Sequence, residues 1–134
     1  MSSRLAPDKL NAAWQYHPQG KPYLEGGPDF SISHCRTAIA VAVSDRPVGI
    51  DIESIRPADE SLIAYTMNEE EQALIHASDD PSRAFTRLWT MKEAYLKYVG
   101  SGITDNLRDA LLPANPAFFH VQSAPAYVCS IYTV

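Results

Sequence analysis

The stretch Val48-Gly49-Ile50-Asp51-Ile52-Glu53 is apolar except for two carboxylates that stand two residues apart. Successive side chains of a strand point to opposite faces, so Asp51 and Glu53 would share one face of a strand. Two like charges on a buried face are costly unless a cation or buried partners compensate them. The stretch therefore predicts a cation-binding face or, alternatively, the solvent-exposed face of an antiparallel sheet.

A second stretch, Leu88-Trp89-Thr90-Met91-Lys92-Glu93-Ala94-Tyr95-Leu96-Lys97, has the pattern of a helix. Glu93 and Lys97 are four residues apart and therefore lie on one helical face. Carboxylate oxygens are the ligands that Mg²⁺ prefers, and a lysine ammonium can meet phosphate charge. If this face meets the acidic strand, the two stretches predict a metal site that handles phosphate. Alternatively, Glu93 and Lys97 form an ordinary pair on a solvated surface, with Lys92 as a solvated neighbour.

Periodicity and turn residues predict the elements around these two stretches. The expected strands are 29–34, 37–44, 48–53, 118–122 and 127–132, and the first three, joined by short turns, favour an antiparallel meander. Helices are expected at 7–14, at 59–65, from Glu69 behind an Asn68 cap, and at 82–99, with an irregular connection over 16–24. The longest helix would bury an apolar stripe of Phe85, Leu88, Trp89, Leu96 and Val99. These elements predict an α+β fold in which an antiparallel sheet packs on a long helix.

Length and composition place the chain among ordinary globular proteins. The 134 residues are 46% hydrophobic and 20% charged, which predicts one folded domain over residues 1–134. A net charge of −5 argues against general nucleic-acid binding, because such proteins usually present a basic face. No apolar run is long enough for a membrane span, and no signal-peptide pattern follows Met1. We expect Cys35 and Cys129 to be free thiols in a cytoplasmic protein.

Four further residues carry candidate chemistry, each with an ordinary alternative. Ser33 and His34 end the strand 29–34 and offer a hydroxyl and an imidazole to an anion, although a lone histidine is more often a structural hydrogen-bonder. Lys21 precedes Pro22 and places a cation on a stiff loop, which also serves solubility. Glu69 is a candidate base, and it is equally natural as part of an acidic helix start.

The order of these motifs is more specific than any one of them. Gly20-Lys21-Pro22, Phe30-Ser31-Ile32-Ser33-His34, Gly49-Ile50-Asp51-Ile52-Glu53 and the stretch from Trp89 to Lys97 follow one another along the chain. In this order they resemble the 4′-phosphopantetheinyl transferase superfamily. Because the Ser-His motif precedes the Gly-Ile-Asp motif, the chain is most similar to the surfactin-synthetase-activating type. The resemblance covers about residues 20–103.

The resemblance implies an enzyme that transfers the 4′-phosphopantetheine arm of coenzyme A to a serine of an acyl or peptidyl carrier protein. In such an enzyme Asp51, Glu53 and Glu93 would hold Mg²⁺. Coenzyme A phosphates would be bound by Lys21, Ser33, His34 and Lys97, and Lys97 would also assist the leaving group. Glu69 would deprotonate the serine, directly or through water. The catalytic residues implied are therefore Glu69, Glu93 and Lys97.

The front of the chain departs from the surfactin-synthetase-activating type, whose members have two similar α/β halves. Residues 1–48 would form a reduced first half, and residues 49–134 the second half with the metal motifs. Either the reduced half still forms a cleft, or a second subunit completes it in a homo-oligomer. Carrier proteins are typically acidic, so docking to this acidic chain would use an apolar patch or local cations such as Arg83 and Arg87.

Two other functions fit parts of the pattern. A metal-dependent nuclease also combines an acidic strand with glutamate and lysine, although the acidic composition and the motif order count against it. A degenerate member of the family could bind carrier protein or coenzyme A without turnover. Mass spectrometry of an apo carrier protein after incubation with coenzyme A and Mg²⁺ distinguishes these alternatives.

Overall fold

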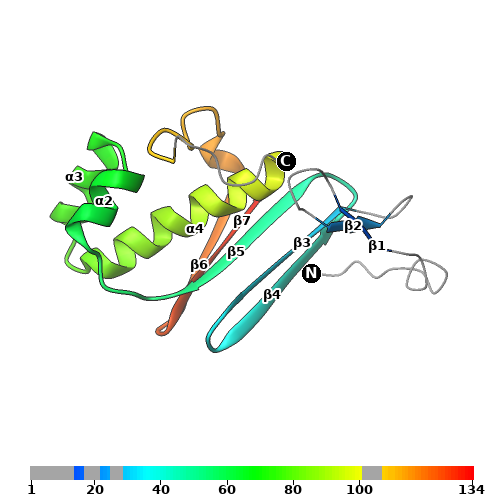
Figure 1. The fold of residues 1–134 in the computed structure, drawn as a ribbon, viewed down its shortest axis with the longest axis horizontal. Coiled ribbons are helices and arrows are strands. Elements are labelled where there is room, and N and C mark those ends of the chain that lie inside the picture. Colours follow the sequence, from blue (N-terminus) through cyan, green and yellow to red (C-terminus); the bar gives the residue numbers. More distant parts are fainter. Residues whose placement is uncertain (1–13, 17–21, 25–28, 101–106) are drawn as a thin grey trace.

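The computed structural model of the chain describes residues 14–16, 22–24, 29–100 and 107–134 (Figure 1). Two short strands come first, β1 (Trp14–Tyr16) and β2 (Pro22–Leu24), and they pair antiparallel. The expectation of an irregular connection over 16–24 is therefore wrong at its two ends. Trp14, expected at the end of a helix, lies in β1, and the remainder of that helix falls outside the described residues.

Three strands then follow in the predicted order: β3 (Asp29–Cys35), β4 (Ala38–Ser44) and β5 (Val48–Ser54). Strands β3 and β4 form an antiparallel hairpin, as expected. The meander ends there, however, because β5 pairs with β7 (Tyr127–Thr133) and not with β4. Strand β6 (Phe119–Ser123) pairs with the other edge of β7, giving a three-stranded antiparallel sheet in the order β5-β7-β6.

Three helices separate β5 from the last two strands. Helix α2 (Glu60–Thr66) begins behind Asp59, whose carboxylate accepts hydrogen bonds from the first-turn amides. Helix α3 (Glu69–Ala77) begins with the predicted Asn68 cap, which forms a reciprocal capping box with Glu71. Helix α4 (Pro81–Val99) ends at Gly100, whose φ of 80° lies in the left-handed region that glycine readily adopts. A short 3₁₀ turn, η1 (Pro116–Phe118), precedes β6.

Helix α4 lies along the sheet β5-β7-β6, and the ribbon of β5 runs between α4 and the β3–β4 hairpin (Figure 1). Gly49 makes the close approach of β5 to α4 possible. A Cβ atom at this position would overlap the backbone of Ala94 and Tyr98. Between α4 and β7, the hydroxyls of Thr90 and Ser130 are both buried and hydrogen-bonded at 2.8 Å. The predicted α+β class, an antiparallel sheet packed on a long helix, is confirmed.

The apolar core contains one cluster at the start of α4 and a second, of Ala42, Val48 and Ile50, on β4 and β5. Ile63, Met67, Ile75 and Phe85 pack together where α2 and α3 meet the start of α4. Near the other end, Tyr132 lies among aromatic rings from Tyr95, Tyr98, Phe118 and Phe119. The predicted stripe of α4 holds at Phe85 and Leu96 but not at Val99, which is 51% exposed. Within the described residues, no helix combines the length and apolar character needed to cross a membrane.

Candidate functional site

The site begins at the contact between β3 and the open edge of β5. Side chains on one face of β3 accept hydrogen bonds from the outward amides of β5. The bonds run from Val48 N to Asp29 Oδ2 (2.7 Å), from Ile50 N to Ser31 Oγ (3.0 Å) and from Ile52 N to Ser33 Oγ (3.0 Å). Because residues two apart share a face of each strand, the three bonds form a regular ladder. This ladder places Ser33 directly beside Asp51.

Asp51 is buried, with 4% of its surface exposed, and only one of its two oxygens has partners among the described residues. Oδ1 accepts a hydrogen bond from Ser33 Oγ at 3.0 Å and lies 3.5 Å from Lys97 Nζ. Oδ2 is buried and has no hydrogen-bond partner among the described residues. Burial raises the pKa of Asp51 to about 8; Lys97 opposes this rise and the Glu53 carboxylate adds to it. Oδ2 of Asp51 would therefore be stabilised by binding a cation or a proton.

Glu53 and Glu93 belong to the same electrostatic neighbourhood. Burial raises the pKa of Glu93; Lys97 opposes the rise, and Glu53 adds to it. The predicted carboxylates therefore act on one another across β5 and α4. In the part of the chain that the structure describes, no three His, Cys, Asp or Glu side chains are arranged to hold a metal ion.

Lys97 reaches from α4 across to both strands. Its ammonium donates to the carbonyl oxygens of Ile50 (3.0 Å) and Ile32 (3.2 Å), in addition to its contact with Asp51. The side chain is still 31% exposed, so the ammonium is not sealed from solvent. The structure thus brings Ser33, Asp51 and Lys97 into direct contact. Glu53 interacts electrostatically with Asp51, and Glu93 with Lys97.

The other predicted binding residues are placed differently. His34 follows Ser33 and is exposed, because successive side chains of β3 face opposite ways. The Ser33 hydroxyl, expected to meet a phosphate, is engaged by Asp51 and by the amide of Ile52. Lys21 lies outside the described residues. Ser33 therefore supports Asp51 here, and its role in phosphate binding stays a prediction, as does that of His34.

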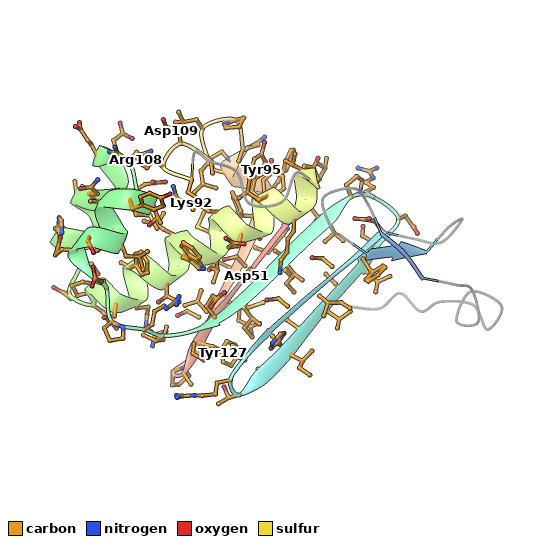
Figure 2. The ribbon with its side chains drawn as sticks, in the orientation of Figure 1. Asp51, Lys92, Tyr95, Arg108, Asp109 and Tyr127 are labelled. Carbon is orange, nitrogen blue, oxygen red and sulfur yellow. The ribbon has the colours of Figure 1, made fainter. Side chains whose placement is uncertain are left out.

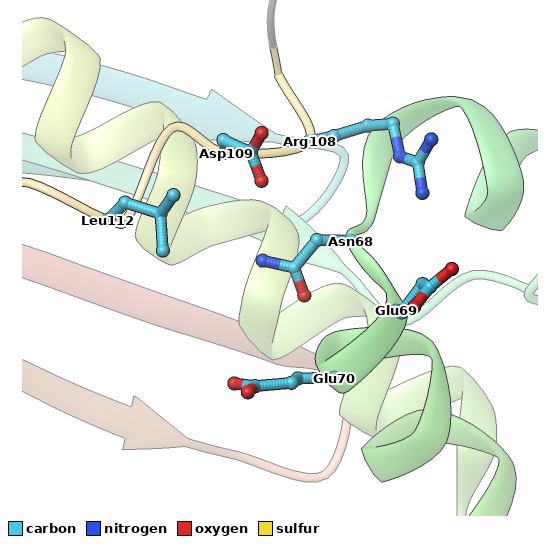
Figure 3. A pocket seen from close by; sticks show the side chains of 6 residues that line it. All are labelled: Asn68, Glu69, Glu70, Arg108, Asp109 and Leu112. Carbon is cyan, nitrogen blue, oxygen red and sulfur yellow. The ribbon is translucent and has the colours of Figure 1, made fainter.

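Glu69, the predicted base, is exposed at the start of α3. It lines a separate open pocket of about 510 Å³ together with Asn68, Glu70, Arg108, Asp109 and Leu112 (Figure 3). In the described residues no hydrogen bond or ion pair connects it with Asp51 or Lys97. The structure therefore groups Glu69 with the segment at Arg108 and Asp109. Its role as a base stays a prediction.

A buried ion pair that the sequence reasoning missed lies next to Glu93. Lys92 has no exposed side-chain surface, so the expectation of a solvated neighbour is wrong. Its ammonium donates to Glu71 Oε1 (2.7 Å) and to the carbonyl oxygens of Leu107 (2.7 Å) and Arg108 (2.8 Å). Burial lowers the pKa of Lys92, and Glu71 opposes that shift. In the sequence, the capping-box spacing of Asn68 and Glu71 indicates that the Glu71 carboxylate has a structural role.

Comparison with known proteins gives a consistent family. The sequence profile of the 4′-phosphopantetheinyl transferase superfamily matches residues 47–130. The 4′-phosphopantetheinyl transferase HetI of Nostoc sp. strain PCC 7120 is 37% identical over 126 residues, which cover 85% of this chain and 52% of that protein. The 4′-phosphopantetheinyl transferase Sfp of Bacillus subtilis strain 168 is 31% identical over 108 residues, covering 78% of this chain and 48% of Sfp.

The gsp protein of Aneurinibacillus migulanus, also a 4′-phosphopantetheinyl transferase, is 34% identical over 95 residues, covering 69% of this chain and 40% of that protein. The chain spans about half the length of the curated relatives that it matches. The matched region contains Asp51, Glu53, Glu93 and Lys97, the side chains that share one electrostatic neighbourhood. By its sequence matches, this chain belongs to the 4′-phosphopantetheinyl transferase superfamily.

Proposed function

We propose that this protein transfers the 4′-phosphopantetheine arm of coenzyme A to a serine hydroxyl of an acyl or peptidyl carrier protein, in the presence of Mg²⁺. The single observation that carries the proposal is the unpartnered, buried Oδ2 of Asp51, next to Glu53 and Glu93. A buried carboxylate oxygen without a partner is costly, and a bound cation removes that cost. Three carboxylates suit a hard divalent cation.

Asp51, Glu53 and Glu93 are the residues that would hold the cation. A divalent cation there would neutralise phosphate charge and orient the attacked phosphorus. Lys97 is proposed to bind the same phosphates, since its ammonium is partly exposed and already lies 3.5 Å from Asp51. Ser33 keeps Asp51 in place through its 3.0 Å hydrogen bond, whatever further contact it makes with coenzyme A.

The remaining roles rest on motif position. Lys21 and His34 are proposed to bind coenzyme A phosphates, and Glu69 to accept the proton of the carrier serine. The leaving product would be adenosine 3′,5′-bisphosphate. The two free thiols, Cys35 and Cys129, fit the predicted cytoplasmic location, where thiols stay reduced. We also propose that a second subunit completes the cleft in a homo-oligomer. A fully active protein that light scattering shows to be a monomer would exclude this.

The direct test incubates the protein with coenzyme A, Mg²⁺ and an apo carrier protein and weighs the carrier by mass spectrometry. We expect the carrier to gain the mass of phosphopantetheine in the wild type. The Glu93→Gln variant should lose at least about a hundredfold in rate, because it removes a charged ligand from the proposed cation that neutralises the reacting phosphates. Failure to modify any of several carriers would contradict the proposal, and a fully active Glu93→Gln variant would contradict the cation assignment.

The base is tested separately. Glu69→Gln should lower kcat by about a hundredfold while leaving the KM for coenzyme A unchanged, as expected for a proton acceptor that does not bind the nucleotide. The neighbouring Glu70→Gln variant removes the same charge from the same pocket and is the matched control. Equal rates for the two variants would exclude Glu69 as the base.

A further inference from the structure

The pocket that contains Glu69 is built from two segments that lie far apart in the sequence (Figure 3). Its first wall is the start of α3, at residues 68–70. Its second wall is the segment 107–112 after α4, which contributes Arg108, Asp109 and Leu112 to the lining. The whole of α4 lies between the two walls along the chain. The distance between the walls therefore depends on contacts that join α3 to the segment 107–112.

Lys92 on α4 makes these contacts. Its ammonium donates to Glu71 Oε1 of α3 at 2.7 Å. It also donates to the carbonyl oxygens of Leu107 and Arg108 in the second wall, at 2.7 and 2.8 Å. Arg108 adds a direct connection, because its Nε donates to the carbonyl oxygen of Met67 at 3.0 Å. One ammonium group on α4 therefore holds both α3 and the second wall of the pocket.

The contact with Glu71 extends to Glu69 through the cap of α3. Glu71 Oε1, the oxygen that Lys92 binds, also accepts a hydrogen bond from the Asn68 amide at 2.8 Å. In return, Asn68 Oδ1 accepts a hydrogen bond from the Glu71 amide at 2.9 Å. Glu69 lies between these two residues in the first turn of α3. The backbone on both sides of Glu69 is thus connected to Lys92.

The burial of this ion pair points to a geometric role. The Lys92 side chain has no exposed surface, and that of Glu71 has 9%. Apolar residues of similar size are often at least as stabilising in such a place, because they require no desolvation of charge. The ammonium uses all three of its donors, so three acceptors define one position for it, whereas an apolar side chain can pack in several. The pair therefore defines one arrangement of α3, α4 and the segment 107–112.

We propose that Lys92 and Glu71 are positioning residues. They set the separation of the two pocket walls, and thereby the position of the Glu69 carboxylate relative to Glu93 and Lys97 of α4. This role rests on the proposed function, in which Glu69 accepts the proton of the carrier serine. Both side chains are buried and act through Glu69, not on a reactant. A displacement of about 1 Å can lower the rate of a catalysed step about a hundredfold.

The first experiment separates position from stability. Lys92→Met leaves the Glu71 charge buried without its cation and should lower the Tm. The Lys92→Met/Glu71→Gln variant removes both charges, while glutamine keeps an oxygen for the Asn68 amide, and should recover most of that Tm. We expect kcat for carrier modification to stay about tenfold or more below the wild type in both variants, with the KM for coenzyme A unchanged.

Phe85→Leu is the matched control on the same helix. Phe85 is fully buried in the core at the start of α4 and does not line the Glu69 pocket. Its replacement should lower the Tm through lost packing and leave kcat at the wild-type value, with both proteins assayed well below their Tm. If the double variant recovers Tm and kcat together, the ion pair has only a structural role and the proposal is overturned.

The second experiment needs no activity. The amides of Ala110 and Leu112 donate to the carbonyl oxygens of Leu107 and Asp109 within the second wall. Hydrogen exchange followed by mass spectrometry should be about tenfold faster for peptides that cover residues 107–114 in both Lys92 variants, relative to peptides of β7 in the same protein. In Phe85→Leu this ratio should keep its wild-type value.

The outcomes distinguish this role from the proposed function. A wild type that modifies no carrier contradicts the proposed function, while faster exchange confined to the Lys92 variants still supports the ion pair as the contact that sets the pocket walls. An unchanged exchange ratio in both Lys92 variants overturns the proposal even if the wild type is an active transferase. A raised KM for coenzyme A with an unchanged kcat also overturns it, because the pair would then affect binding of the ligand and not the position of Glu69.

Discussion

Two lysines of helix α4, five residues apart, pair with carboxylates in opposite ways. Lys92 is fully buried, lies 2.7 Å from Glu71 and donates to two carbonyl oxygens as well, which uses all three donors of an ammonium. Lys97 is partly exposed and lies 3.5 Å from Asp51, whose second oxygen is left without a partner. In Figure 2, Lys92 lies near Arg108 and Asp109, and Asp51 lies on the opposite side of α4.

This difference separates structure from function within one helix. A pair whose hydrogen bonds are all made holds elements together and has no capacity left for a ligand. A pair with an unmet oxygen and an accessible ammonium costs stability but can bind a cation and a phosphate. Glu93 is adjacent to Lys92 in the chain, and burial raises its pKa, a rise that Lys97 opposes and Glu53 adds to. The incomplete pair lowers the stability of the folded state at the place where we propose the chemistry.

The largest expected effect comes from breaking the satisfied pair. Lys92→Met leaves the Glu71 carboxylate without its cation and should lower the free energy of unfolding by about 3 kcal/mol in urea denaturation. Glu71→Gln should cost a similar amount, because the ammonium stays buried. The double variant should be more stable than the sum of the two losses predicts, and additive losses would show that the two side chains do not interact.

The next effect concerns the pH dependence of stability, and it is tested by replacing the Asp51 carboxyl group of the incomplete pair with an amide. Asp51 has a folded pKa of about 8 and an unfolded pKa of about 3.9, so the folded state retains a proton that the unfolded state has lost between these values. The stability of the metal-free protein should therefore fall as pH rises from about 4 to about 8, and Asp51→Asn should remove that fall.

Thermal denaturation at several pH values measures this effect as a fall in the Tm of the metal-free protein between about pH 4 and about pH 8. Mg²⁺ should raise the Tm of the wild type at pH 8, because the ionised carboxylate is its ligand, and should not raise that of Asp51→Asn. An Asp45→Asn variant, altered in an exposed turn, is the control and should respond as the wild type does. A wild type whose Tm does not change with Mg²⁺ would contradict the cation assignment.

The smallest effect is expected at the contact that supports Asp51. Ser33→Ala removes the hydrogen bond to Asp51 and leaves the amide of Ile52 without its acceptor, which should cost about 1–2 kcal/mol of unfolding free energy. Ser31→Ala breaks only the bond to the Ile50 amide and is the matched comparison. If Ser33 positions Asp51, its variant alone should require more Mg²⁺ for activity. Equal Mg²⁺ dependence in the two variants would limit Ser33 to a structural role.

Local patterns were enough to predict the strands 29–34, 37–44 and 127–132, the α4 helix and the Asn68 cap, because each depends on neighbouring residues. The pairing of β5 with β7 was not predictable in this way, since the partners Ile52 and Cys129 are far apart in the sequence. The burial of Lys92 was missed for the same reason: its acceptors come from α3 and from the segment after α4.

The candidate site shows a similar division. The spacing of Asp51 with Glu53, and of Glu93 with Lys97, was sufficient to predict two acidic faces, and the structure brings them into one electrostatic neighbourhood. The unpartnered oxygen of Asp51 could not be read from the sequence, because it depends on how Ser33 and Lys97 share the other oxygen.

The ladder from β3 to β5 has a consequence for how the protein behaves in a crowded solution. An edge strand with free amides can template strand addition and aggregation. Here Asp29, Ser31 and Ser33 occupy the outward amides of β5 with side chains, so this edge offers no continuous row of donors to another chain. The strand that carries the acidic face is thus protected from self-association without an additional backbone partner.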